Sequence, residues 1–383
     1  MYPISIIGSG LAGYTLAKEI RKLDKTIALQ IFTADDGSFY SKPTLSNALS
    51  KQLDAKQLVM HTAEHMATQL NANIITHTRV TQINCAERTL IANNKIYPYA
   101  SLVLASGAEA IRIPVAGDAA ADIISVNSLQ DYAQFRDQLQ HKKHVTILGA
   151  GLIGCEFAND LANAGFSVSL IDLTDKPLGR LLPEMTARNL QQKLQALNIS
   201  WHLGRSLSSM QHLSQQSTAY ALTLDNQHTI QTDLVLSAIG LKPVLQLAQA
   251  ANIKTARGIV TNEYLQTSEH TIYALGDCAE FCGSVLPFIL PIMIGARALA
   301  KTLLGDSTPV VYPPMPVVVK TPAQAVVVCP PPMNAAGSWQ EQDLGDGIKA
   351  LFYAGNKLLG FALTGSAVAE KQKLVKHMQD SAA

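Results

Sequence analysis

Six glycines in two sets have the spacing of a phosphate-binding loop. They are Gly8, Gly10 and Gly13 in one set and Gly149, Gly151 and Gly154 in the other. In a G-x-G-x-x-G loop the first glycine turns the chain out of a strand, the second lets a pyrophosphate approach the backbone, and the third lets the next helix pack closely. The unpaired N–H groups of that helix then face the phosphates. The sequence therefore predicts two dinucleotide sites.

An acidic residue follows the second glycine set where a ribose contact is expected. The apolar run from Val168 to Ile171 predicts a strand that ends at Asp172, which is 172 − 149 = 23 residues after Gly149. A carboxylate there can accept hydrogen bonds from both ribose hydroxyls and repels a 2′-phosphate. We therefore expect NADH rather than NADPH at this site.

The first glycine set lacks such an acid at the strand end. The strand predicted over 28–32 ends near Thr33 or Ala34, and the first acidic residues are Asp35 and Asp36. The ribose contact of the first site stays open.

Two charged residues could act on a redox ring. Lys42 lies in the segment 38–51, which we expect to be an irregular loop because Pro43 disfavours a regular helix before it. It could stabilise the negative charge of a reduced flavin, or it could be an ordinary surface lysine. Glu156 stands two positions after Gly154, in the first turn of the expected helix. The helix dipole alone would explain an acid there, and the alternative is that Glu156 pairs with Lys42.

Two further segments could contact the same ligand. A short apolar strand over 272–275 is followed by Gly276 and Asp277, and a helix is expected over 291–304. The Asp277 carboxylate could accept hydrogen bonds from a sugar alcohol, although an aspartate after a strand is often only a cap. Near Val80, the segment 71–83 is placed to pass its backbone over an adenine.

The composition excludes several classes of protein. A chain of 383 residues is expected to form two or three domains. With 48% hydrophobic and 15% charged residues, it suits parallel strands buried under helices. A net charge of +1 gives no basic surface for nucleic acid or an anionic membrane. We find no apolar run of membrane-spanning length and no leader before the first strand, so we expect a cytoplasmic protein.

The cysteines argue against thiol and metal chemistry. The chain has five of them, at Cys85, Cys155, Cys278, Cys282 and Cys329. They form no C-x-x-C pair and no zinc spacing, so we expect reduced thiols and no metal site. Residues 14–51, which follow the first glycine set, contain no cysteine.

The order of motifs predicts an α/β chain with two Rossmann-like dinucleotide-binding domains and a small α+β C-terminal domain. We place the first domain at residues 1–108 and 242–309, and the second at 109–241. From residue 310 the chain is Pro-rich, then carries two apolar runs around Gly355-Asn356-Lys357 that suggest a hairpin, and ends in a helix expected over 366–379. These features assign 310–383 to the third domain.

Together, the two glycine sets, the runs LVLASGA and LVLSAIG and the block IYALGD resemble the glutathione-reductase-like superfamily of FAD-dependent pyridine nucleotide-disulfide oxidoreductases. The resemblance covers residues 1 to about 305. It implies FAD at the first site, with Asp277 on the ribitol, and NADH or NADPH at the second, where Asp172 favours NADH. It also implies transfer of a hydride from NADH to the flavin.

The chain resembles, more narrowly, those members of this superfamily that have no redox disulfide and pass single electrons to rubredoxin. The likeness lies in the segments TADDGSFYSKPTLS and VKTP and in the lack of a cysteine in residues 14–51. That resemblance implies rubredoxin as the partner, ahead of an alkane hydroxylase. A ferredoxin or flavorubredoxin reductase is the alternative, and a flavin- and NADH-binding signalling protein is a more distant one. The FAD contacts that it implies beyond the first glycine set and Asp277 are Ser9, Leu11, Ala12, Thr33, Ala34, Lys42, Val80, Glu156, Ile289 and Lys320.

Overall fold

A computed structural model describes residues 2–213 and 219–380. The chain divides into two compact units, each made of three stretches of sequence. The first unit contains residues 1–42, 56–109 and 241–312, and the second contains 43–55, 110–240 and 313–383. Each unit is described by itself.

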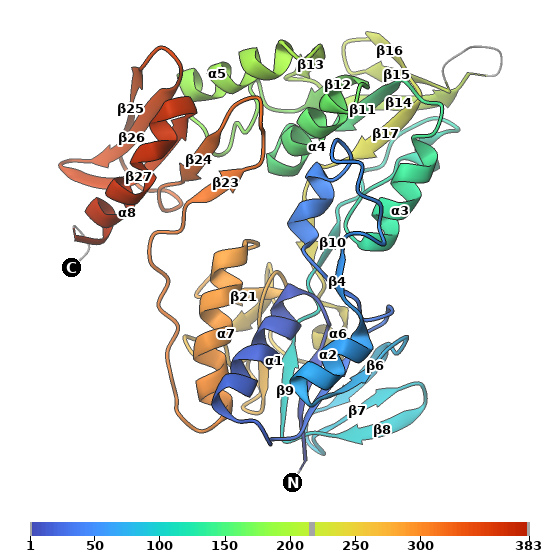
Figure 1. Cartoon of the computed structure of the whole chain (residues 1–383), viewed down its shortest axis with the longest axis vertical. Coiled ribbons are helices and arrows are strands. Elements are labelled where there is room, and N and C mark those ends of the chain that lie inside the picture. The colour runs from blue at the N-terminus through green and yellow to red at the C-terminus, as the bar shows by residue number, and fades with distance from the viewer. Residues whose placement is uncertain (1, 214–218, 381–383) are drawn as a thin grey trace. The chain divides into compact units, whose positions relative to one another are not determined.

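The first unit is built on a parallel sheet in the order β20-β9-β1-β2-β5. Its strands are β1 (Ile4–Ile7), β2 (Leu29–Phe32), β5 (Asn73–Ile75), β9 (Ser101–Leu104) and β20 (Ile272–Ala274). Helices α1 (Leu11–Leu23) and α7 (Ile289–Leu303) pack side by side against this sheet (Figure 1). The helix α2 (Ala63–Leu70) contacts β5, the edge strand.

Smaller elements complete the first unit. They are an antiparallel sheet of β6 (Val80–Asn84), β7 (Thr89–Ala92) and β8 (Lys95–Pro98), a second sheet of β19 (Ile259–Thr261), β21 (Ala279–Phe281) and β22 (Ser284–Val285), the pair β3 (Phe39–Tyr40) and β4 (Val59–His61), and α6 (Gln246–Ala250). The paired strands β10 (Ala108–Ala110) and β18 (Leu241–Pro243) mark where the chain leaves this unit and returns.

The second unit repeats the same plan with one strand fewer. Its parallel sheet has the order β13-β12-β11-β17. The strands are β11 (His144–Leu148), β12 (Ser167–Asp172), β13 (Ile199–Leu203) and β17 (Leu234–Ser237), and the helices are α3 (Leu129–Gln138), α4 (Leu152–Asn163) and α5 (Glu184–Gln195). An antiparallel sheet of β14 (Leu207–His212), β15 (Tyr220–Leu224) and β16 (Thr229–Thr232) follows in the chain.

The C-terminal part of the second unit is a five-stranded antiparallel sheet with a helix. The sheet has the order β23-β24-β27-β26-β25 and α8 packs on β27 (Figure 1). The bounds are β23 (Val317–Val319), β24 (Val326–Cys329), β25 (Ser338–Asp343), β26 (Ile348–Ala354), β27 (Lys357–Thr364) and α8 (Lys371–Asp380). This confirms the predicted fold class, with two Rossmann-like sheets and a small α+β part.

The structure corrects two local predictions. The segment around Lys42 is not an irregular loop, because Tyr40 ends the short strand β3 and a 3₁₀ helix runs over Lys42–Asn47. The last helix begins at Lys371 rather than at 366, because a 3₁₀ turn occupies Gly365–Glu370. The expected hairpin is present as β26 and β27. Within the described ranges, no helix is long and apolar enough to cross a membrane.

Candidate functional site: two dinucleotide cradles

The first glycine loop connects β1 to α1. A Cβ on Gly8, whose φ is +116°, would lie 2.2 Å from the carbonyl oxygen of Ala105, and a Cβ on Gly13 would lie 1.9 Å from the carbonyl oxygen of Gly8. Neither contact is sterically allowed, so both positions require glycine. A Cβ on Gly10 would meet nothing within 4 Å. Gly10 therefore borders open space at the start of α1, as expected where a pyrophosphate approaches the backbone.

The second glycine loop, between β11 and α4, has the same geometry. A Cβ on Gly149 (φ +100°) would lie 2.6 Å from the carbonyl oxygen of Ala238, and one on Gly154 would lie 1.8 Å from that of Gly149. A Cβ on Gly151 would again meet nothing within 4 Å. Neither helix has a side-chain cap, because Gly10 and Gly151 are the N-cap residues. In both loops, therefore, the shape fits a dinucleotide phosphate.

Asp172 lies at the edge of the second loop, as its position predicts. Its carboxylate accepts a hydrogen bond from the backbone N–H of Ala150 at 2.6 Å. Its other oxygen accepts bonds from the N–H and the hydroxyl of Thr174, at 2.7 and 2.6 Å. These three bonds fix the carboxylate beside the loop, where it can accept a hydrogen bond from a ribose hydroxyl.

In the first loop a hydroxyl takes the corresponding place. Phe32 pairs with Ile7 in the register in which Ile171 pairs with Leu148, so Thr33 is the counterpart of Asp172. The Ser9 hydroxyl donates to the Thr33 oxygen at 2.8 Å, and the Thr33 hydroxyl donates to Asp35. Ala34 lies between Thr33 and Asp35 in the sequence, and Leu11 and Ala12 are the first residues of α1. Asp35 is thus the first acid behind the strand end and is bound to Thr33, and the ribose contact of this site stays a prediction.

Asp277 reaches the first loop through Gly276. A Cβ on Gly276 would lie 2.8 Å from the Cβ of Ala12, so the chain after β20 passes directly against the start of α1. Burial raises the pKa of the Asp277 carboxyl above its usual 3.8, and the positive charge of Lys42 opposes this shift. Asp277 is therefore a buried carboxylate next to the start of α1, and its pKa depends on the charge of Lys42.

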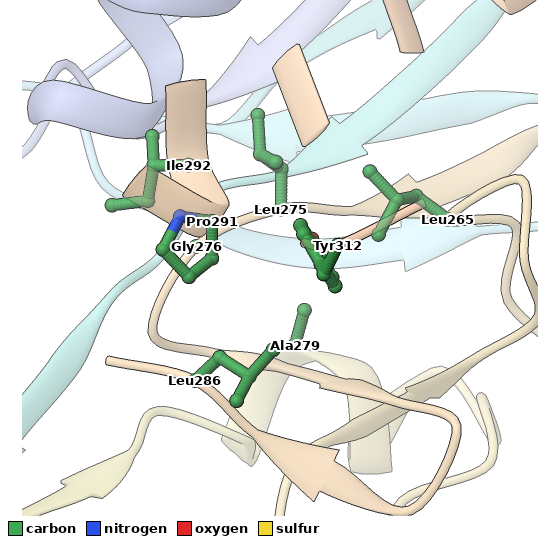
Figure 2. Close-up of a pocket in the computed structure, with 8 residues that line it drawn as sticks. All are labelled: Leu265, Leu275, Gly276, Ala279, Leu286, Pro291, Ile292 and Tyr312. Atoms are coloured by element: carbon green, nitrogen blue, oxygen red, sulfur yellow. The ribbon is translucent and has the colours of Figure 1, made fainter. Parts of the chain in front are cut away.

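Two other predicted contacts also belong to the first unit. Val80 is buried at the start of β6, and two residues before it the N–H of Thr78 donates to the carbonyl of Thr33 at 2.8 Å. Ile289, the first residue of α7, is exposed. Gly276 also borders a cavity of about 10 Å³, which is lined by Leu265, Leu275, Gly276, Ala279, Leu286, Pro291, Ile292 and Tyr312 (Figure 2). That space is the size of about one water molecule and is too small for a dinucleotide.

Glu156 and Lys320 meet in the second unit. The Glu156 side chain is only 3% exposed and forms an ion pair with the ammonium group of Lys320. Its Oε1 accepts the backbone N–H of Lys320 at 2.9 Å, and its Oε2 accepts the hydroxyl of Ser46 at 2.5 Å. Ser46 was missed by sequence reasoning because it lies 110 residues from Glu156. The ion pair seen here is with Lys320, and the expected pairing of Glu156 with Lys42, from the other unit, stays a prediction.

The cysteines fit the prediction of reduced thiols. All five are free, and Cys155, Cys278 and Cys329 are buried. Burial raises the pKa of the Cys329 thiol to about 11, so this thiol is protonated and unreactive near neutral pH. Among the residues that the structure describes, no cluster of three or more His, Cys, Asp or Glu side chains is arranged to hold a metal ion.

Known proteins resemble this chain in the segments that form both glycine loops. Residues 2–300 match the model of the family described as pyridine nucleotide-disulphide oxidoreductase, and 309–378 match one described as rubredoxin binding C-terminal domain. A rubredoxin-NAD(+) reductase of Alcanivorax borkumensis is 46% identical over 99% of both chains. A nitric oxide reductase FlRd-NAD(+) reductase of Vibrio vulnificus is 38% identical, again over 99% of both.

A solved structure shows the same fold. It is a putidaredoxin reductase in covalent complex with putidaredoxin, and it superimposes with a TM-score of 0.89 at 23% identity, over 99% of this chain and 93% of that one. The family match spans both glycine loops and the segment of Asp277, which are the parts that form the two cradles. The chain therefore belongs to the pyridine nucleotide-disulphide oxidoreductase family.

Proposed function

We propose that this chain is an NADH-dependent FAD oxidoreductase that reduces rubredoxin. The observation that carries the proposal is the match of residues 309–378 to a rubredoxin-binding domain, in a chain that also holds two dinucleotide cradles. The relative from Alcanivorax borkumensis carries the name of this activity and is similar along its whole length. Bound FAD supplies the chemistry, because it accepts a hydride from NADH and releases the two electrons one at a time.

The first unit would hold FAD. The loop of Gly8, Gly10 and Gly13 binds the pyrophosphate, and Thr33 with Asp35 faces the adenosine ribose. Asp277 accepts hydrogen bonds from the ribitol, and Lys42 keeps a positive charge close to that carboxylate. The remaining contacts in this unit are Ser9, Leu11, Ala12, Ala34, Val80 and Ile289.

The second unit would hold NADH. The loop of Gly149, Gly151 and Gly154 binds the pyrophosphate, and Asp172 accepts the ribose hydroxyls and rejects a 2′-phosphate. From the resemblance alone we also assign Glu156 and Lys320, which form an ion pair with a buried carboxylate, to the flavin contacts. We assign the catalytic roles to Lys42 and Glu156, because the charge of Lys42 acts on Asp277 and Glu156 follows the second glycine loop in α4.

The domain organisation that we propose follows the sequence. Residues 1–108 and 242–309 bind FAD, 109–241 bind NADH, and 310–383 form the C-terminal domain. The two compact units support the boundaries of the second domain, because the chain leaves the first unit after Glu109 and returns at Leu241. Residues 43–55 and 313–383 nevertheless belong to the same unit as the NADH cradle.

Electrons would pass to rubredoxin without a thiol relay. No cysteine lies between residues 14 and 51, so no dithiol in that segment can stand between the flavin and the acceptor. Rubredoxin holds one iron and takes one electron, so two copies are reduced for each NADH. We place the protein in the cytoplasm, where reduced rubredoxin would supply a membrane-bound alkane hydroxylase.

A flavorubredoxin is the second candidate acceptor. The similarity to the Vibrio vulnificus protein named as a FlRd-NAD(+) reductase favours it, although the identity is 38% rather than 46%. The two reductions would use the same cradles and differ in the docking surface alone.

An acceptor comparison tests the proposal. The FAD-loaded protein is mixed anaerobically with NADH and with a rubredoxin, the rubredoxin domain of a flavorubredoxin, or a [2Fe–2S] ferredoxin, and the rate of iron reduction is measured. Fastest reduction of free rubredoxin is the expected result. Preference for either other acceptor would overturn the choice of partner, and reduction of none would overturn the function.

A further inference from the structure

One face of α4 is polar although it is buried. Glu156, Asn159 and Asp160 are 3%, 0% and 3% exposed, and their spacing of three and four residues places them on the same side of the helix. Burying such groups is costly unless each is hydrogen-bonded. The partners of this face therefore show what the helix holds.

Asp160 binds a segment that is distant in sequence. Its two carboxylate oxygens accept the backbone N–H of Leu49 at 2.8 Å and that of Ser50 at 3.1 Å, and one of them also accepts the Ser50 hydroxyl. Further along this segment, the carbonyl of Leu53 accepts the hydroxyl of Tyr132 at 2.9 Å. Residues 49–53 are thereby fixed at both ends.

The other two polar residues of this face of α4 bind two further segments of the chain. The Ser46 hydroxyl donates to Glu156 at 2.5 Å, and the N–H of Ala323 donates to Asn159 at 3.0 Å. The same helix thus joins residues 46–50 to residues 320–323, and its first residue directly follows Gly151 of the NADH cradle. The segments also border a cleft of about 270 Å³ along the helix.

We propose that Asp160 is a positioning residue for hydride transfer. By fixing residues 49 and 50, it keeps Ser46 in contact with Glu156 and restrains the chain that begins immediately after Lys42. This inference rests on the proposed function, in which Lys42 and Glu156 serve the flavin. Asp160 itself lies one turn of α4 beyond Glu156 and acts only through the segment that it holds.

The chain supplies a matched control in Asp131. Its carboxylate also accepts two backbone N–H groups, those of Asn127 and Ser128, both at 2.9 Å, but it does so locally at the start of α3. Exchanging either aspartate for asparagine replaces one acceptor oxygen by an N–H₂ donor. Both changes remove a charge and should weaken the fold. Only the change at residue 160 must release a backbone contact, because the N–H groups of Leu49 and Ser50 bind different oxygens of Asp160. The two N–H groups at Asp131 both bind Oδ2, which an asparagine oxygen can replace.

The test compares Asp160→Asn with Asp131→Asn in the FAD-loaded protein. For Asp160→Asn we expect faster hydrogen exchange at the amides of Leu49 and Ser50. We also expect flavin reduction at saturating NADH to slow by about tenfold, because small misplacements reduce rates strongly. The dissociation constant of NADH should change by less than about twofold, because the glycine loop is untouched. Asp131→Asn should lower the melting temperature but leave all three quantities unchanged.

Two outcomes would overturn the inference. In the first, Asp160→Asn and Asp131→Asn show the same amide hydrogen exchange and the same rate of flavin reduction. In the second, Asp160→Asn shows faster amide exchange but an unchanged rate of flavin reduction. If Asp160→Asn does not fold, Ser50→Ala removes only the hydroxyl contact, and the same two comparisons apply to it with smaller effects. If NADH fails to reduce the flavin of the wild-type protein, the proposed function fails, whereas the exchange comparison still reports whether Asp160 holds the segment.

Discussion

The two glycine loops have the same backbone conformation and differ in the residue that follows the next strand. In both loops the first and third glycines exclude a Cβ and the middle one borders open space. At the strand end, however, the second unit has Asp172 and the first has Thr33, with Asp35 behind it. The comparison teaches that the backbone conformation of the loop is independent of the side chain at the strand end, so the proposed pyrophosphate and ribose contacts can be tested separately.

The largest effects are expected from alanine at the third glycines. Gly154→Ala should abolish NADH binding and leave the flavin content intact, and Gly13→Ala should give a protein without flavin. In each case the new Cβ would lie within 2 Å of a carbonyl oxygen, at 1.8 and 1.9 Å. Flavin absorbance and NADH titration measure the two outcomes.

Alanine at the middle glycines separates fold from binding. In Gly151→Ala and Gly10→Ala, the added Cβ would meet no protein atom within 4 Å, so the apoprotein should melt at the wild-type temperature. The dinucleotide that binds at the changed loop should bind more weakly. A lowered melting temperature of the apoprotein would show that these positions serve the fold rather than the ligand.

Removing the carboxylate at the second strand end should have an intermediate effect. Asp172→Ala should cost about 1 to 3 kcal/mol of NADH binding, because a charged hydrogen bond to the ribose is lost. It should also narrow the preference for NADH over NADPH, since the repulsion of the 2′-phosphate disappears. An unchanged Michaelis constant for NADH would show that Asp172 holds only Ala150 and Thr174.

The equivalent change in the first unit should cost less. Thr33→Val removes a neutral hydroxyl, so FAD binding should weaken by about 0.5 to 1.5 kcal/mol. Apoprotein titrated with FAD measures this. A loss as large as that of Asp172→Ala would mean that the two strand ends bind ribose in the same way.

The smallest effect is expected at Asp277, which follows β20, the strand without a counterpart in the second unit. Burial raises the pKa of the Asp277 carboxyl above 3.8. The folded apoprotein therefore holds this proton more tightly than the unfolded chain, so its stability falls as pH rises from about 3.8 through the raised pKa. Asp277→Asn should reduce that fall and weaken FAD binding. Melting curves of the apoprotein across this pH range check it, and identical slopes for both proteins would contradict it.

Local patterns predicted both cradles, because glycine spacing, strand ends and helix starts lie within one βαβ unit. The pair of Glu156 and Lys320 could not be derived this way, since 164 residues separate them, and Lys320 and Ile289 were expected from the resemblance alone. Strand β25 was missed because its residues SWQEQD are largely exposed at a sheet edge and show no apolar run. Contacts made by distant polar residues leave no periodic signal in the sequence.

The most direct test of the whole account is an anaerobic titration of the FAD-loaded protein. We predict that one equivalent of NADH bleaches the flavin absorbance and that two equivalents of oxidised rubredoxin restore it, because a hydride carries two electrons and each rubredoxin iron accepts one. A flavin that NADH does not bleach, or that rubredoxin does not reoxidise, would contradict the assignment of the two cradles and of the acceptor.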